Sequence, residues 1–271
     1  MPVPQKQIVD QAFAFNRTAS LQPLFLKSAS IFIVLIIWET AGRISNSMSL
    51  PTFLDTAVAF YRLVLSGRLP LALLHSSSSM IVGLLLALVV GNVLGLLIGW
   101  SRLIERCLTV YLTIMLAIPM MAMIPVFIVI FGLGLGSRIA VVFVFAVPII
   151  IINVATGVRT VDRNLVLMAD SFGATRLQLL KNILLPGASP AILAAVRLGI
   201  GRAIVGMIAA EMLVVAVGFG SLLLEFGATM KPQNSFAVLL TVIGVSVAVM
   251  ALAQRVEKRL TPWARLKLRD Y

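Results

Sequence analysis

The sequence contains a single cysteine, Cys107, and a single histidine, His75. One cysteine excludes an internal disulfide, and so few thiol and imidazole groups argue against a zinc or haem site. Charged residues are also scarce, because Asp, Glu, Lys and Arg together make up 12% of the chain. Soluble domains carry about 25% charged residues. The sequence therefore predicts a protein that lies mostly within a membrane.

The sequence also lacks a phosphate-binding loop. That motif requires G-x-x-x-x-G-K followed by Ser or Thr, and the one such Lys-Ser pair, Lys27-Ser28, has leucines where both glycines should stand. No nucleophile elbow, zinc-helix motif or haem motif occurs either. We therefore predict no catalytic residue, no metal site and no cofactor bound by this chain itself.

Apolar residues dominate what is present, at 60% of the chain, with a mean hydropathy of +1.07. A membrane-spanning helix needs about 20 mostly apolar residues. Six stretches meet this requirement: residues 24–42, 80–100, 107–131, 139–158, 187–215 and 235–253. We expect an all-α polytopic membrane protein with a segment 1–23, a transmembrane domain 24–254 and a basic tail 255–271.

Positive charges predict how the chain is oriented. Of its 22 Lys and Arg residues, Arg197 and Arg202 lie in the fifth span. Five lie on one side of the membrane, and the other 15 share the side of both termini. Cytoplasmic loops of membrane proteins are enriched in Lys and Arg. We therefore expect both termini in the cytoplasm, and we assign the net charge of +12 to this orientation rather than to a nucleic-acid partner.

Two longer segments fall on the opposite, outer side. Residues 45–79 contain an amphipathic run, residues 53–65, and are expected to lie on the outer surface. Residues 217–234 contain Gly218 and Gly220, followed by the charged residues Glu225 and Lys231. They fit either a re-entrant or a surface segment.

Residues 161–186 form the longest polar-containing interruption of the apolar sequence. On a helical wheel of 100° per residue, the first half places one set of apolar side chains on a single arc: Leu165, Val166, Met168, Ala169 and Phe172. Leu167 is the only large apolar residue opposite them. A second amphipathic pattern runs from Gly173 to Pro186, where proline is expected to end the helix. Such a helix pair either packs on its own bundle or docks a partner.

The second half of this stretch carries a specific resemblance. Gly173, nine residues and then Ile183-Leu184-Leu185-Pro186 resemble the EAA loop of permease subunits of ATP-binding-cassette (ABC) importers. That signature reads E-A-A, three residues, G, nine residues, I-x-L-P. Its first three positions fall on Leu167, Met168 and Ala169, so the glutamate is absent.

The resemblance implies that residues 161–186 form coupling helices that seat in a cleft of a cytoplasmic ATPase. Leu167 would then replace the missing acidic contact by packing. The implied coupling residues are Leu167, Met168, Ala169, Asp170, Gly173, Ala174, Ile183, Leu185 and Pro186.

The third span contains A-I-P-M-M-A-M-I-P-V-F, which is followed by F-G-L-G-L-G-S-R. Prolines bend a spanning helix and free backbone carbonyls. This stretch is similar to the nitrate, sulfonate and taurine branch of the family. The candidate pathway residues here are Pro119, Met120, Met121, Met123 and Pro125, with ordinary helix packing as the alternative.

Two further features lie within spans. Glu211 is an acid in the fifth span, where ionisable residues are costly. We expect it either to shape the pathway or to pair with a basic residue of another helix. Gly91, Gly95 and Gly99 recur every fourth residue of the second span, and we expect them to let another helix approach closely rather than to line a pathway.

The resemblance as a whole predicts the permease subunit of a type I ABC importer in the bacterial inner membrane. It implies ATPase subunits that bind ATP-Mg, an extracytoplasmic binding protein, a second permease copy and surrounding lipid. The solute expected for this branch is a small anion such as nitrate, a sulfonate or taurine. An ion-coupled secondary transporter and a non-transport membrane scaffold are the alternatives.

Overall fold

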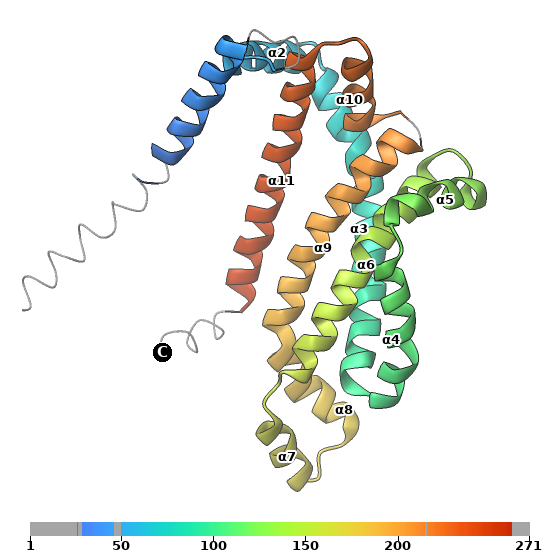
Figure 1. The fold of residues 1–271 in the computed structure, drawn as a ribbon. Helices are drawn as coiled ribbons and strands as arrows, with labels where there is room; N and C mark the ends of the chain where they lie inside the picture. Colours follow the sequence, from blue (N-terminus) through green and yellow to red (C-terminus); the bar gives the residue numbers. More distant parts are fainter. Residues whose placement is uncertain (1–25, 27–28, 46–49, 215, 262–271) are drawn as a thin grey trace, which may run out of the picture.

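The computed structural model describes residues 26, 29–45, 50–214 and 216–261, which are helical apart from short connections. A helix over residues 29–45 comes first (Figure 1). The remaining elements are α2 (Phe53–Leu65), α3 (Arg68–Trp100), α4 (Arg102–Ala117), the 3₁₀ turn η1 (Met120–Met123), α5 (Ile124–Phe131), α6 (Leu135–Arg159), α7 (Arg163–Ser171), α8 (Arg176–Leu179), the π-helical turn η2 (Leu180–Leu184), α9 (Leu185–Leu213), α10 (Gly218–Ala228) and α11 (Pro232–Leu260).

Among the described residues, four helices are long and apolar enough to cross a membrane. They are α3, α6, the helix Arg176–Leu213 and α11. The pair formed by α4 and η1–α5 makes a fifth if it counts as one broken span. The first predicted span, 24–42, lies partly outside the described residues and overlaps the helix over residues 29–45. The all-α polytopic fold is thus confirmed. Segment 1–23 and residues 262–271 of the tail lie outside the described part.

The centre of the bundle is the packing of α3 and α9 against the two sides of α6 (Figure 1). On α3, a Cβ atom at Gly91 would come within 2.7 Å of the Ile150 side chain, and one at Gly95 within 2.7 Å of Val154. A Cβ at Gly99 would come within 2.6 Å of Val158. Real Cβ atoms do not approach so closely. The three glycines therefore allow α3 and α6 to pack at a distance that a larger residue would prevent.

A matched pair of glycines tests this packing. Gly95→Ala is expected to lower the unfolding temperature in detergent, because the new methyl overlaps Val154 and the carbonyl of Ile151; overpacking typically costs about 1–3 kcal/mol. Gly244→Ala on α11 meets nothing within 4 Å and is expected to raise that temperature, since alanine favours helix over glycine by about 1 kcal/mol. Equal effects at the two sites would contradict the packing role.

The outer segment is corrected in part. Helix α2 matches the predicted amphipathic run, and Thr52 caps it by accepting the N–H of Asp55. Residues 68–79 do not form a separate surface segment, because α3 begins at Arg68 and continues unbroken to Trp100. The serine run within them has an exposed side, at Ser78, and a buried side. Ser76 and Ser79 are fully buried, and the Ser79 hydroxyl donates to the Ser76 carbonyl.

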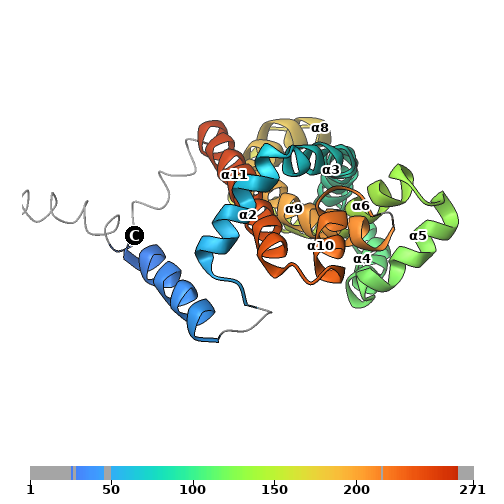
Figure 2. The same ribbon diagram turned by 90° about the horizontal axis from the view of Figure 1, so that it is seen from above.

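The third span is broken at Pro119 rather than bent, and Pro125 lies in the first turn of α5. Ile118 is extended, with ψ of 129°, which is the conformation that a following proline favours. Helix α4 therefore ends there, and η1–α5 leaves at an angle of 94°. In both views α5 projects sideways from the bundle (Figures 1 and 2).

The predicted helix end at Pro186 is wrong. Residues Arg176–Leu213 form one helix of 38 residues, with Pro186 in the first turn of α9. The π-helical turn η2 comes just before it, and there the Leu185 N–H donates to the carbonyl of Leu180. A proline cannot donate to the carbonyl four residues earlier, and the wider turn accommodates this loss without ending the helix.

The other open segment, residues 217–234, contains a short helix. Helix α10 packs among α3, α9 and α11, and its buried residues include Phe219, Leu222 and Phe226. It is therefore not a free surface loop. Helix α11 runs on to Leu260, so the predicted domain boundary at residue 254 lies inside a helix.

Candidate functional site

Helices α7 and α8 form a hairpin at one end of the bundle, directly after α6 (Figure 1). Asp162 caps α7, and Thr175 and Gln178 form a capping box on α8. Gly173 joins them with φ of +73°, a left-handed conformation that glycine adopts without strain. The Gly173 N–H donates to the Asp170 carbonyl at 2.9 Å. Local sequence thus fixes both helix starts and the turn between them.

The base of the hairpin is anchored to the long helices by an apolar cluster. Val158 of α6, Leu184 of η2 and Ala188 of α9 are buried together. Val166 of α7 packs against them, as do Leu179 and Leu180. The hairpin is therefore attached to α6 on one side and to α9 on the other.

The tip of the hairpin exposes apolar side chains. Phe172 is 84% exposed and Leu177 71% exposed, and Leu165, Leu167 and Met168 are each about half exposed. We call these five residues the apolar tip. Of the apolar arc predicted on the first helix, the structure buries Ala169 and half-buries Val166. The arc therefore does not cover its own bundle, and Leu167 is one exposed apolar residue among several. The exposed apolar side chains of the tip thus come from both arcs of α7 and from α8.

The predicted coupling residues divide into two groups. Leu167, Met168, Asp170 and Gly173 lie in the hairpin and are exposed, whereas Ala169 is buried and Ala174 half-buried. Ile183, Leu185 and Pro186 belong to η2 and the start of α9 instead. The structure therefore does not bring the two halves of the motif together at the tip.

The candidate pathway residues lie toward the other half of the bundle. Met121 is exposed at the break between α4 and α5, whereas the neighbouring Ile124 is buried in an apolar cluster with Val141 of α6 and Ala210 of α9. The proline break is therefore joined to α6 and α9 through one apolar cluster. Glu211 itself is fully buried, and its Oε2 accepts the N–H of Gly220 at 3.0 Å. Glu211 forms no direct ion pair among the described residues, but the charge of Arg138 on α6 acts on it, so Arg138 is the candidate for the expected basic partner.

Two ion pairs near the hairpin end could not be found from the sequence. Arg159 of α6 pairs with Glu105 of α4 at 2.8 Å. Arg197 of α9 pairs with Glu257 of α11 at 3.1 Å. The partners are far apart in the sequence, and neither pair belongs to a recognisable motif. Each joins a peripheral helix to a central one.

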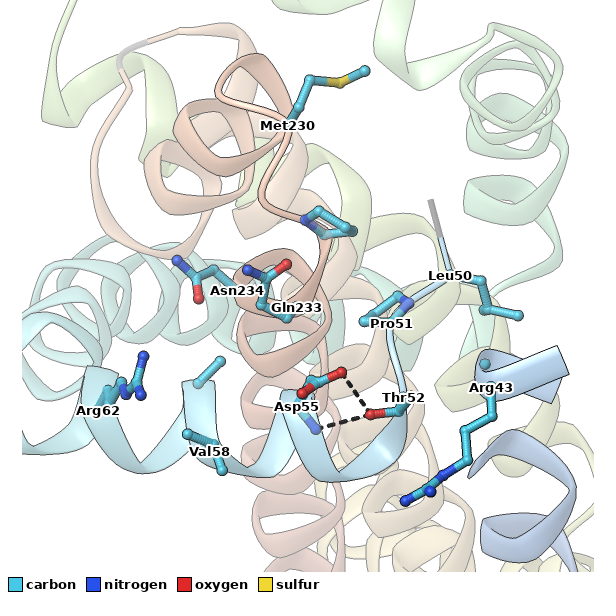
Figure 3. Close-up of a pocket in the computed structure, with 13 residues that line it drawn as sticks. Arg43, Leu50, Pro51, Thr52, Asp55, Val58, Arg62, Met230, Gln233 and Asn234 are labelled. Carbon is cyan, nitrogen blue, oxygen red and sulfur yellow. Dashed lines mark hydrogen bonds between the residues drawn. The ribbon is translucent and has the colours of Figure 1, made fainter. Parts of the chain in front are cut away.

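A polar depression of about 1060 Å³ lies at the opposite end of the bundle, between α2 and the start of α11 (Figure 3). Its polar lining includes Arg43, Thr52, Asp55, Arg62, Gln233 and Asn234. Thr52 and Asp55 bond each other there (Figure 3). The proline and methionine residues of the third span do not line it. No group of three or more His, Cys, Asp or Glu in the described residues could hold a metal ion.

Known proteins resemble this chain over most of its length. The putative aliphatic sulfonates transport permease protein SsuC of Bacillus subtilis is 28% identical over 85% of this chain and 84% of its own. The riboflavin transport system permease protein RibX of Chloroflexus aurantiacus is 29% identical over 91% of this chain and 94% of its own. A chain of the MetNI methionine ABC transporter, inward facing, shares the fold. It matches with a TM-score of 0.58 and 24% identity, over 70% of this chain and 93% of that one.

A family model matches residues 91–262, which span α3 from Gly91 to the end of α11 and include the whole α7–α8 hairpin. The multi-pass helical fold, the hairpin and these relatives all agree with that match. The chain belongs to the family of binding-protein-dependent transport system inner membrane components, the permease subunits of ABC importers.

Proposed function

We propose that this permease carries a small, anionic solute, such as a sulfonate, and that its apolar tip is the surface that binds the ATPase. The observation that supports the ATPase contact is the tip itself. It exposes Phe172 and Leu177 on a hairpin whose second helix is continuous with a spanning helix. A partner that pushes on α8 therefore moves α9.

The orientation follows from the same contact. ATP is made and used in the cytoplasm, so the α7–α8 end is the cytoplasmic end and the α2–α10 end faces outward. The Lys and Arg distribution supports this, because the described helices carry Arg163, Arg176 and Lys181 at the hairpin end. The substrate-binding protein then reaches the permease at the outer end, where the polar depression opens.

A second copy of the chain is the proposed partner within the membrane. The helix over residues 29–45 is attached at its outer end, where the Trp38 indole donates to the Pro51 carbonyl at 3.0 Å and contacts Phe53 and Phe236. Its other half diverges from α11 in both views (Figures 1 and 2). In the most apolar 18-residue stretch of the facing helix α11, only 11% is buried. Two such copies would cover these apolar faces, and the pathway would lie between them.

The solute is proposed from the relatives rather than from a lined site. One relative is named for aliphatic sulfonates and another for riboflavin, so the shared feature is a small organic molecule. The sulfonate is preferred because the third-span sequence resembles the nitrate, sulfonate and taurine branch.

Reconstitution tests this function. We expect the chain to purify with an ATPase from its own genome as a complex of two permeases and two ATPases. Native mass spectrometry would measure this composition. In proteoliposomes, uptake of a radiolabelled aliphatic sulfonate should require ATP inside the vesicle and the binding protein outside. Uptake driven by an ion gradient without ATP would indicate a secondary transporter instead. A stable assembly without uptake of any solute would indicate a scaffold.

A further inference from the structure

Two spanning helices hold the first turn of α10. Glu211 near the end of α9 accepts the N–H of Gly220 at 3.0 Å, and the Ser76 hydroxyl of α3 accepts the N–H of Phe219 at 3.2 Å. N–H groups in the first turn of a helix have no partner within that helix. Both side chains are fully buried. They therefore supply hydrogen bonds that water cannot reach.

The contact between Glu211 and α10 is close enough to dictate the local sequence. A Cβ atom at Gly218 would lie 2.4 Å from the Ser76 hydroxyl oxygen and 2.5 Å from Oε1 of Glu211. One at Gly220 would lie 2.5 Å from the Glu211 Cβ. Gly218 also has φ of +63°. Only glycine fits at these two positions while the carboxylate remains against the α10 backbone.

The other end of α10 is held by the same helix α3. Arg68 forms an ion pair with Glu225, and its guanidinium lies 5.0 Å from the centre of the Phe226 ring. Arg68 and Ser76 both belong to the first turns of α3. We call Arg68, Ser76, Glu211 and Glu225 the α10 clamp.

Burying the carboxylate of Glu211 to make this contact costs free energy of desolvation. Its Oε1 is buried without a hydrogen-bond partner, as are Nε and Nη1 of Arg138 on α6. Apolar residues of similar volume often stabilise a buried position better than charged ones. We therefore attribute the carboxylate at this position to its contact with the start of α10 rather than to a contribution to the stability of the bundle.

The helix that carries Glu211 also carries the coupling helix. Arg176–Leu213 is one helix of 38 residues, which at 1.5 Å per residue is about 57 Å long. Glu211 lies near one end of it and Leu177 of the apolar tip near the other. A displacement of α10 therefore acts through Glu211 on the helix whose other end the proposed ATPase contacts.

We propose that Glu211 is a positioning residue that joins α10 to α9, so that a substrate-binding protein pressing on α10 and its following turn acts on α8. The turn after α10 is exposed, with Met230 72% exposed and in a left-handed conformation at φ of 51°. It borders the outer polar depression (Figure 3). This inference rests on the proposed function, since it requires an ATPase and a binding protein.

The test measures ATP hydrolysis by the reconstituted permease–ATPase complex with and without the binding protein. Glu211→Ala leaves the N–H of Gly220 without a partner, and we expect the ratio of stimulated to basal rate to fall at least about tenfold while the basal rate stays within about twofold. Glu211→Gln keeps one acceptor oxygen but removes the charge, and the ratio is expected to fall about threefold. Thr241→Val is the control, because that hydroxyl bonds only within α11.

Partial rescue by glutamine separates positioning from a general loss of structure, because Glu211→Gln retains an acceptor oxygen for the N–H of Gly220 on α10. If Glu211→Ala does not assemble, Glu211→Gln decides alone. Wild-type stimulation in the assembled Glu211 variants, an equal loss in Thr241→Val, or a loss in Glu211→Gln as large as that in Glu211→Ala would overturn the inference. Failure of the wild-type chain to bind any ATPase would overturn the proposed function instead.

Discussion

Gly173→Pro is expected to reach the membrane at the wild-type level and to take up no solute. Gly173 has φ of +73°, whereas proline is fixed near −65°. The substitution also removes the N–H that donates to the Asp170 carbonyl. The turn between α7 and α8 cannot form, so the apolar tip is no longer presented as one surface. The measurement is ATP-dependent uptake, with membrane content determined by immunoblot.

Two milder substitutions at the same position provide the control. No other atom lies within 4 Å of a Cβ placed at Gly173, so a side chain there meets no steric clash and the backbone conformation alone matters. Asparagine tolerates the left-handed region and should retain most uptake. Alanine there is strained by about 1–2 kcal/mol and should retain an intermediate rate. Uptake that is equal in all three variants would show that the turn is not a rigid joint.

The sequence predicted the elements whose signals are local. Helix α2 and the hairpin joint at Gly173 depend on residues within one or two turns of each other, and so does the interruption at Pro119, where the sequence predicted a bend and the structure has a break. The extended conformation of Ile118 follows from Pro119 alone. These features needed no knowledge of what packs against them.

The sequence did not predict the features that depend on which other element packs nearby. The serine run that ends at Ser79 was too polar to be counted as part of a span, yet Ser76 and Ser79 are buried in the bundle, and Ser76 bonds α10 from 143 residues away. The end at Pro186 was wrong because a π-helical turn absorbs the missing donor. The helical wheel identified the apolar arc of α7, but it carries no information on whether the bundle or another protein covers that arc.

The second substitution with a large expected effect is at Phe172, on the exposed side of the hairpin. Phe172→Asp is expected to abolish co-purification of the ATPase. Phe172 is the most exposed apolar residue of the tip, at 84%, and central aromatic anchors in interfaces typically contribute about 2 kcal/mol or more, a factor of roughly 30 in affinity. Leu167→Asp should weaken the association less, because Leu167 is 51% exposed. Asn182→Asp adds the same charge at an exposed polar position of η2 and should leave the complex intact.

The order of these effects identifies the docking face. If Leu167→Asp releases the ATPase while Phe172→Asp does not, the partner contacts the polar arc of α7, as the resemblance to the EAA loop implied. If Phe172→Asp has the larger effect, the apolar arc faces the ATPase, which explains why the hairpin leaves it uncovered in a single chain. The missing glutamate then has a physical counterpart, because desolvating apolar side chains replaces a charged contact at this site. The affinities are best compared at two ionic strengths, since a packed apolar contact is insensitive to salt whereas an ion pair weakens.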